Sequence, residues 1–305
     1  RRFEVIYAIM DIGSNTVRLS VYKERNGEAV SLFSEKDQVS LKSYVKDGKL
    51  TNKGIKRLYN TLKKFKALVD NFEDIDGVYP FATATVRDVA NRKEVLDLMK
   101  EDLDLDIEIL SGEEEAKLAF VGASVSTEVK EGVLCDIGGG STEVVIIGQG
   151  KVIKSNSLSI GSLSAFNDYV DGLFVDKDSK KLIENKVIQL FGDSSIYEED
   201  FKILSAVGGS ARAALNFYKD YYKLEDDTRS MDVKEFDTMV KDLIKKSDKK
   251  KMRLILDVKP DRIHTLLPGM IILNEISKFF NIETINVSQT GVREGYVYSK
   301  LLGRK

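Results

Sequence analysis

The sequence predicts an α/β protein of two similar domains, each with a mixed sheet flanked by helices. A strand, a glycine-rich turn opened by an aspartate, and two further strands occur at Asp11 and again at Asp136. Helical and strand patterns alternate after each of these meanders, which is typical of sheets covered by helices. The length of 305 residues suits two domains of about 150 residues each. The repeated unit suggests two domains that face one another across a cleft.

Local patterns predict the elements of the first half of the chain. Thr51 and Ser111 are good caps for the starts of two helices, and Leu58, Leu62 and Phe65 follow one another at helical spacing. Strands are predicted where β-branched and apolar residues run between turn residues. The strands are 5–11, 16–23, 29–35, 77–82 and 107–110, and the helices are 51–71, 91–100 and 112–122.

The second half begins with the repeated meander and continues mainly with helices. We place the domain boundary near Gly122, so that residues 1–122 form an N-terminal domain and residues 123–305 a C-terminal domain. The last helix could pack back on the first domain. The predicted strands are 132–136, 142–147, 151–157, 202–207 and 284–287, and the predicted helices are 162–169, 177–191, 232–246, 259–280, 292–302 and one that starts at 210.

Composition excludes several classes of protein. General nucleic-acid binders are usually strongly basic, so the formal net charge of −2 gives no support for that role. The single cysteine, Cys135, excludes an internal disulfide framework and a thiolate zinc cluster. His264 is the only histidine, which excludes a multi-histidine metal site. No apolar run approaches the ~20 residues that span a bilayer, and no signal-peptide pattern opens the chain, so we expect a cytoplasmic protein without a membrane segment.

Three glycine-rich turns are candidate phosphate cradles, over residues 11–16, 136–143 and 207–211. Glycine lets backbone N–H groups approach a phosphate closely, and successive N–H groups form an anion-binding concavity. For any one of these turns taken singly, a tight hairpin is the better explanation. Two hairpins that are each opened by an aspartate make that explanation weaker, because a carboxylate beside a phosphate cradle is a ligand that Mg²⁺ prefers.

Two further stretches carry charged candidates. In Ser111-Gly112-Glu113-Glu114-Glu115-Ala116, acids occupy the first turn of a helix, where the helix dipole alone favours them. One of these acids could instead face the cleft and orient a water, as phosphoryl transfer to water requires. Arg87 lies just beyond a strand end, where ligands gather, and its planar fork suits phosphate. A surface ion pair is an equally good local explanation for Arg87.

Taken in order, these stretches resemble the exopolyphosphatase / guanosine pentaphosphate phosphatase family, in particular its short two-domain branch. The matching motifs are D-x-G-S-N-T at Asp11, A-T-x-x-x-R ending at Arg87, S-G-x-E-E-A at 111–116 and D-I-G-G-G-S-T-E at 136–143. Larger members of the family carry further C-terminal helical domains. The resemblance implies two actin-like (ribonuclease H-like) domains with mixed five-stranded sheets flanked by helices, and an active site in the interdomain cleft.

The resemblance also implies a role for each matching residue. Glu115 would be the base or water-orienting carboxylate, Arg87 would clamp the phosphate chain, and Glu143 would position the water or bind metal. Asp11, Asp136 and Glu143 would hold Mg²⁺ or Mn²⁺. The residues that would bind phosphates are Ser14, Asn15, Thr16, Arg87, Gly138, Gly139, Gly140, Ser141, Gly208, Gly209 and Ser210.

The expected activity is release of orthophosphate from the end of polyphosphate or from the 5′ end of guanosine pentaphosphate. The alternatives are a nucleotide-dependent kinase or ATPase of the actin-like superfamily, and a non-catalytic sensor of guanosine tetra- or pentaphosphate. Family members are often dimers, so a homodimer is the assembly that the resemblance implies. The basic stretch from Lys241 to Arg253 could guide a polyanionic tail, although a solvated helix and loop explain it somewhat better.

Overall fold

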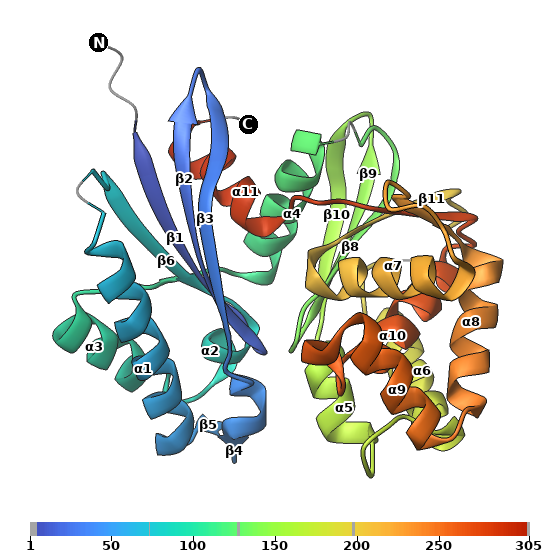
Figure 1. Cartoon of the computed structure of the whole chain (residues 1–305). Coiled ribbons are helices and arrows are strands. Elements are labelled where there is room, and N and C mark those ends of the chain that lie inside the picture. The colour runs from blue at the N-terminus through green and yellow to red at the C-terminus, as the bar shows by residue number, and fades with distance from the viewer. Residues whose placement is uncertain (1–4, 73, 127–128, 197–198, 304–305) are drawn as a thin grey trace. The chain divides into compact units, whose positions relative to one another are not determined.

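The computed structural model of this chain describes residues 5–72, 74–126, 129–196 and 199–303 (Figure 1). The chain divides into two compact units. Unit 1 holds the residues up to Glu115 together with those from Tyr296 onward, and unit 2 runs from Ala116 to Gly295. The predicted boundary at Gly122 lies in the same helix, α4 (Gly112–Ser126), as this division. None of the helices in the described part of the chain has both the length and the apolar character that crossing a bilayer requires.

Unit 1 is built on a five-stranded sheet with the order β3-β2-β1-β6-β7. The first three strands form an antiparallel meander, and β6 and β7 run parallel to β1. The apolar stripe of the helix predicted to begin after Thr51 packs on this sheet, and the Thr51 hydroxyl caps the helix by accepting from Gly54 N. The strands are β1 (Ile6–Ile12), β2 (Thr16–Arg25), β3 (Glu28–Gln38), β6 (Gly77–Ala82) and β7 (Glu108–Ile109), and the helices on the sheet are α1 (Asn52–Val69) and α3 (Arg92–Leu103).

The sequence patterns did not predict several short elements of unit 1. They are the 3-10 helix η1 (Leu41–Tyr44), the two-stranded hairpin of β4 (Val45–Lys46) and β5 (Lys49–Leu50), and the helix α2 (Ala84–Asp88). Each has five residues or fewer, too few to show a period.

The end of the chain is bound to unit 1 by specific contacts. The predicted single helix over 292–302 is instead α11 (Val292–Tyr296) followed by the π-helical η3 (Val297–Leu301). The Tyr296 ring stacks on Phe81 with centroids 5.0 Å apart, and its hydroxyl donates to Glu108 over 2.7 Å. The Tyr298 hydroxyl donates to Glu28 and accepts from the backbone N–H of Ala29.

Unit 2 repeats the sheet of unit 1 and extends it. Its strand order is β10-β9-β8-β11-β13-β12, with an antiparallel meander of β8, β9 and β10, and with β11 and β13 parallel to β8. The α/β class with two units, each built on a mixed sheet flanked by helices, is therefore confirmed, but this sheet has six strands instead of the expected five. The strands are β8 (Gly132–Ile137), β9 (Thr142–Gly148), β10 (Lys151–Leu158), β11 (Ile203–Val207), β12 (Ser230–Asp232) and β13 (Thr284–Val287). The extra strand β12 pairs antiparallel with β13 and has only three residues.

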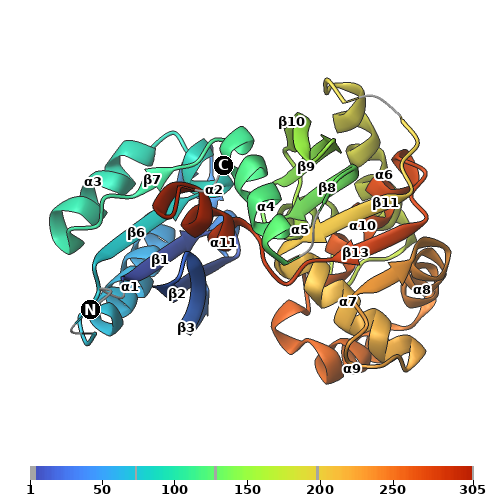
Figure 2. The ribbon, with the colours of Figure 1, turned by 90° about the horizontal axis from the view of Figure 1, so that it is seen from above.

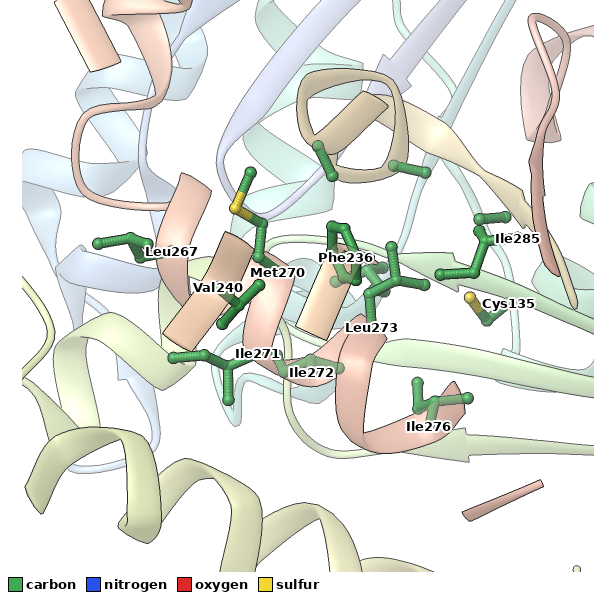
Figure 3. Close-up of a cluster of buried hydrophobic side chains, with 14 of the residues drawn as sticks. Cys135, Phe236, Val240, Leu267, Met270, Ile271, Ile272, Leu273, Ile276 and Ile285 are labelled. Carbon is green, nitrogen blue, oxygen red and sulfur yellow. The ribbon is translucent and has the colours of Figure 1, made fainter. Parts of the chain in front are cut away.

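Helices cover both faces of this second sheet. On one face, Ala116, Ala119 and Ala123 of α4 pack on Leu134 and Val145, and Figure 2 shows α4 beside β8 and β9 on the side away from α6. The opposite face carries the larger core, where α10 is the central helix (Figure 3). The helices of this larger core are α5 (Ser162–Tyr169), α6 (Lys177–Gly192), α7 (Gly208–Tyr222), α8 (Val233–Lys245), α9 (Asp248–Val258) and α10 (Leu266–Phe279).

Figure 3 shows how the larger core is filled. Met270 and Leu273 of α10 lie among Phe236 of α8 and Ile285 of β13, all of them fully buried. Cys135 lies in the same core, and burial raises the pKa of its thiol, so that it stays protonated and serves as a small apolar side chain.

Three predictions for unit 2 are corrected. The helix expected over 259–280 is instead the short η2 (Pro260–Arg262) followed by α10. A separate helix, α9, was not predicted. The glycine pair Gly208-Gly209 was expected to form a turn before a helix at Ser210, but it is itself the first turn of α7.

Candidate functional site

The two aspartate-led turns have the same backbone structure. In unit 1 the N–H of Gly13 donates to the carbonyl of Thr16 over 3.1 Å, and in unit 2 the N–H of Gly138 donates to Ser141 over 2.9 Å. A Cβ atom at either glycine would stand 3.0 or 3.1 Å from that carbonyl oxygen, which explains the glycine at this position in both turns. Asp11 and Asp136 therefore occupy equivalent positions, two residues before the turn glycine.

The unit 2 turn is oriented by the start of α5. The carbonyls of Gly138 and Gly139 accept from the N–H groups of Ser162 and Leu163, each over 2.9 Å. The described chain contains no cis peptide, so the N–H on the other side of each peptide plane points the opposite way. The amides of Gly139 and Gly140 are therefore directed away from α5, as an anion-binding concavity requires.

The third glycine-rich stretch meets this turn through Asp136. Val207 pairs with Asp136 across β11 and β8, and α7 begins at the next residue. Gly208 has φ +83°, in the region that disfavours other residues, and a Cβ atom there would overlap Oδ1 of Asp136. The N-terminus of α7, which is the positive end of its helix dipole, therefore lies directly beside Asp136, a predicted metal ligand.

Asp136 and Glu143 lie opposite one another on neighbouring strands. Side chains of directly opposed residues point to the same face, with Cβ atoms about 4.5–5.5 Å apart. Glu143 is fully buried, and its Oε1 accepts from the hydroxyls of Ser141 and Ser157 over 2.9 and 2.8 Å. Two carboxylates are therefore held side by side next to the amide-lined turn.

Unit 1 holds its turn in a similar way but with a different charge pattern. The carbonyls of Ser14 and Asn15 accept from the backbone N–H groups of Lys42 and Ser40. Both turn residues are almost completely buried, and Asn15 also accepts from the Ser40 hydroxyl over 3.1 Å.

The residue opposite Asp11 is Arg18, where unit 2 has Glu143. A cation thus faces the aspartate of unit 1, whereas a second carboxylate faces that of unit 2.

The three acids at the start of α4 have different environments. Glu114 accepts from both the N–H and the hydroxyl of Ser111, which is the capping role that the dipole explanation describes. Glu113 is exposed to solvent, whereas Glu115 is only 7% exposed. Helix capping therefore explains the position of Glu114, but it does not explain why Glu115 is buried.

Arg87 and Glu115 are brought together within unit 1. Nη1 of Arg87 lies 3.2 Å from Oε2 of Glu115 and 3.0 Å from the carbonyl oxygen of Leu110. Its Nε donates to the exposed Asp88 over 3.1 Å. Arg87 lies in α2, directly after β6, so the carboxyl end of that strand positions it as the sequence indicated. The roles predicted for this pair stay predictions.

Two residues beside the unit 2 turn were missed by the sequence reasoning. Arg262 of η2 donates to the hydroxyl of Ser210 over 3.3 Å, and a Cβ atom on Gly209 would overlap its guanidinium. Gly161 lies against the glycine turn, where a Cβ atom would stand 2.6 Å from the nitrogen of Gly140. The glycine in I-G-S after a strand was a readable signal, but nothing around Arg262 in the sequence pointed to this place.

The basic stretch from Lys241 to Arg253 is partly structural. Lys241 and Lys246 pair with acids four residues earlier on α8, and Lys251 is only 3% exposed. The ammonium of Lys251 donates to the carbonyl of Val175 over 2.9 Å and fixes α9 to the loop before α6. The stretch therefore forms the end of α8 and the start of α9, and its use as a track stays a prediction.

The donor set of unit 2 fits a magnesium ion. Mg²⁺ takes one or two carboxylates and completes its shell with water and phosphate oxygens, and the opposed Asp136 and Glu143 supply those two carboxylates beside an anion-binding turn. Within the described residues, no group of three or more His, Cys, Asp or Glu side chains is placed to hold a metal. The assignment of Asp11 as a ligand, and of the active site to a cleft between the domains, stay predictions.

Comparison with protein families identifies the chain. A model of the Ppx/GppA phosphatase family matches residues 20–304. The chain belongs to this family. Three of the four motifs, the one ending at Arg87, 111–116 and 136–143, lie inside the matched range, and the motif at Asp11 precedes it.

Individual relatives are distant. The chain is 26% identical over 303 residues to a bifunctional 3-dehydroquinate synthase/phosphatase from Fusobacterium nucleatum, covering 92% of this chain and 44% of that protein. It is 27% identical over 309 residues to a guanosine-5′-triphosphate,3′-diphosphate pyrophosphatase from Aeromonas salmonicida, covering 97% and 59%. The chain thus spans about half the length of these two relatives.

The fold has a solved counterpart over its full length. A crystal structure of an exopolyphosphatase from Cytophaga hutchinsonii superimposes with a TM-score of 0.84 and 22% identity, covering 98% of this chain and 99% of that one. At this identity the likeness establishes the fold.

The contact between Gly208 and Asp136 leads to a test of stability. Gly208→Ala should lower the free energy of unfolding by clearly more than the roughly 1–2 kcal/mol that a left-handed backbone costs a non-glycine residue, because the new methyl group also displaces the Asp136 carboxylate. Gly150→Ala is the matched control, since Gly150 has φ +69° and open space around it. Urea denaturation of both variants measures the difference. Equal losses of unfolding free energy in the two variants would show that the Asp136 carboxylate moves aside without an energetic cost.

Proposed function

We propose that this protein is a magnesium-dependent exophosphohydrolase that releases orthophosphate from the end of polyphosphate, from the 5′ end of guanosine pentaphosphate, or from both. The observation that supports this most strongly is the pair of opposed carboxylates, Asp136 and Glu143, beside amides directed away from α5. A site with these parts suits a phosphoanhydride and a divalent cation together. The names of the pyrophosphatase and exopolyphosphatase relatives point to the same class of bond.

The proposed reaction is attack by water on the terminal phosphorus. The bond between that phosphorus and the bridging oxygen breaks, the chain leaves one phosphate shorter, and orthophosphate is released. In P-loop enzymes and kinases such transfers depend on positioning and on neutralising charge, with little covalent chemistry from the protein. Glu115 would orient the water and accept its proton, and Arg87, 3.2 Å away, would bind the terminal phosphate.

The remaining residues would hold the phosphate chain. In unit 2 the amides of Gly139 and Gly140, the hydroxyl of Ser210 and the guanidinium of Arg262 would contact phosphate oxygens. In unit 1 the Ser14–Thr16 turn would provide equivalent amides. Magnesium, when bound, would neutralise charge on the phosphate oxygens. Without these cations and N–H groups, the site carboxylates would repel a polyanion.

The substrate class is tested by a direct assay. We expect the purified protein, with Mg²⁺, to release phosphate from long polyphosphate or guanosine pentaphosphate faster than from ATP, because the pyrophosphatase and exopolyphosphatase relatives are named for those two substrates. Phosphate release on the three substrates in parallel measures this. Faster release from ATP would favour the kinase or ATPase reading. Tight binding of guanosine pentaphosphate without release would favour the sensor reading.

The role of Glu115 is tested by an isosteric change. Glu115→Gln should lower kcat by about 10²–10⁴-fold with little change in substrate binding, because a positioned general base contributes that much. Glu113→Gln is the matched control, since Glu113 lies on the same helical turn but is exposed. Phosphate release at saturating substrate measures both variants. A loss of only a few-fold for Glu115→Gln would assign the base to another residue.

The metal role of Glu143 is tested by its magnesium dependence. Glu143→Gln keeps an oxygen for the Ser141 and Ser157 hydroxyls but removes the charge, so the Mg²⁺ concentration for half-maximal activity should rise by at least about tenfold. The control is Glu131→Gln at an exposed position just before β8. An unchanged magnesium requirement, with binding of the metal measured separately by calorimetry, would remove Glu143 from the metal site.

A further inference from the structure

Unit 2 contains two adjoining cavities that the proposed reaction does not use. Their volumes are about 280 and 800 Å³, and Arg229 and Gln289 line both. Their linings come from the loop after β13, from α7 and from the loop before β12, and Figure 2 labels α7 and β13. The lining residues that the structure describes all belong to unit 2.

The smaller cavity is cationic. Arg212 and Lys219 come from α7 and are seven residues apart, which places them on one face of the helix, and Arg229 adds a third cation from the loop before β12. The only acidic side chain in its described lining is Asp226. Its carboxylate stands 4.0 Å from the ammonium of Lys219 and is fully exposed to solvent, so their attraction is weak.

Backbone carbonyls hold these cations in place. Nη1 of Arg212 donates to the carbonyls of Ser288 and Gln289, and the Lys219 ammonium and Arg229 Nη1 both donate to the carbonyl of Asp226 over 2.8 Å. A carbonyl oxygen orients a cation but carries no net charge. The Lys219 side chain is only 15% exposed, so its position is set by packing as well. Cations fixed in this way around a cavity concentrate phosphate oxygens.

The larger cavity has a different character. Ala123, Val129 and Ile203 give it apolar surface, Asn286 and Gln289 add amide side chains, and its lining also includes one cation and one acid before β8, Lys130 and Glu131. An amide both donates and accepts hydrogen bonds, which matches the edge of a nucleobase. The volume of about 800 Å³ lies within the range of about 300–1,000 Å³ for small-molecule sites.

We propose that unit 2 binds a nucleoside phosphate here, with its phosphates among Arg212, Lys219 and Arg229 and its base in the larger cavity. Lys219 is eleven residues beyond Gly208, about 16 Å along the helix, and Arg212 is four residues beyond it, about 6 Å, so the cations of this site extend along α7 away from the glycine turn. The nitrogen of Gly208 lies 3.9 Å from where a Cβ atom on Gly291 would stand, in the same loop as Ser288 and Gln289. A ligand in this site therefore contacts both the helix and the loop that adjoin Asp136. The proposal does not depend on the proposed hydrolase activity.

Calorimetric titration of the full chain with ADP, GDP and pyrophosphate, without added metal, tests the proposal. We expect at least one of the two nucleotides to bind more tightly than pyrophosphate. The double variant Lys219→Ala, Arg229→Ala should weaken nucleotide binding by at least about tenfold, since each removes a charge-assisted contact. Lys223→Ala, at the exposed end of the same helix, should leave it within about twofold. Equal binding by the double variant and the wild type would overturn the proposal.

Two further variants separate the cavities from the candidate phosphate site. Asn286→Ala should weaken nucleotide binding and leave pyrophosphate binding unchanged, because Asn286 lines only the larger cavity. Glu143→Gln should leave nucleotide binding in the absence of metal unchanged. Nucleotide binding that strengthens in Glu143→Gln, because a repelling carboxylate is gone, but is kept in the double variant would place the nucleotide at the glycine turn, and the proposal would be wrong. Pyrophosphate that binds as tightly as both nucleotides would exclude a base site.

Discussion

The Cα atom of Gly208 lies so close to the carboxylate of Asp136 that no side chain fits between them. This approach follows from the parallel pairing of β11 with β8, which ends both strands at the same edge of the sheet. Because α7 begins at that residue, the positive end of a helix, a carboxylate and an amide-lined turn are assembled at a single point. The other parts of the candidate phosphate site in unit 2, including Arg262 at Ser210, are arranged around this contact.

The duplicated turn shows how one backbone can serve two electrostatic purposes. Gly13 and Gly138 make the same hydrogen bond, so the turns in the two units are equivalent. The residue across the strand pair differs, since Arg18 faces Asp11 whereas Glu143 faces Asp136. The position opposite the aspartate therefore carries a positive charge in unit 1 and a second negative charge in unit 2. A divalent cation is therefore better accommodated in unit 2.

The pairing of Arg87 with Glu115 links two motifs that are far apart in the sequence. β6 and β7 bring the end of A-T-x-x-x-R next to the start of α4, so the guanidinium reaches the buried carboxylate. The neighbouring acids in the first turn of α4 show that a place in that turn is not sufficient to bring a carboxylate to Arg87. Glu114 is used for capping and Glu113 is exposed, whereas Glu115 is turned inward.

Short-range signals in the sequence determined the Thr51 cap, the two meanders and the order of the motifs, because caps, turns and strand alternation depend on neighbouring residues. The three-residue β12 exists only because β13 offers it an edge, and the first turn of α7 forms at two glycines because of what packs around them. Arg262, likewise, gains its place beside Ser210 from residues about fifty positions away. Only the tertiary structure decides such features, because their free energy comes from contacts between distant segments, which local patterns do not encode.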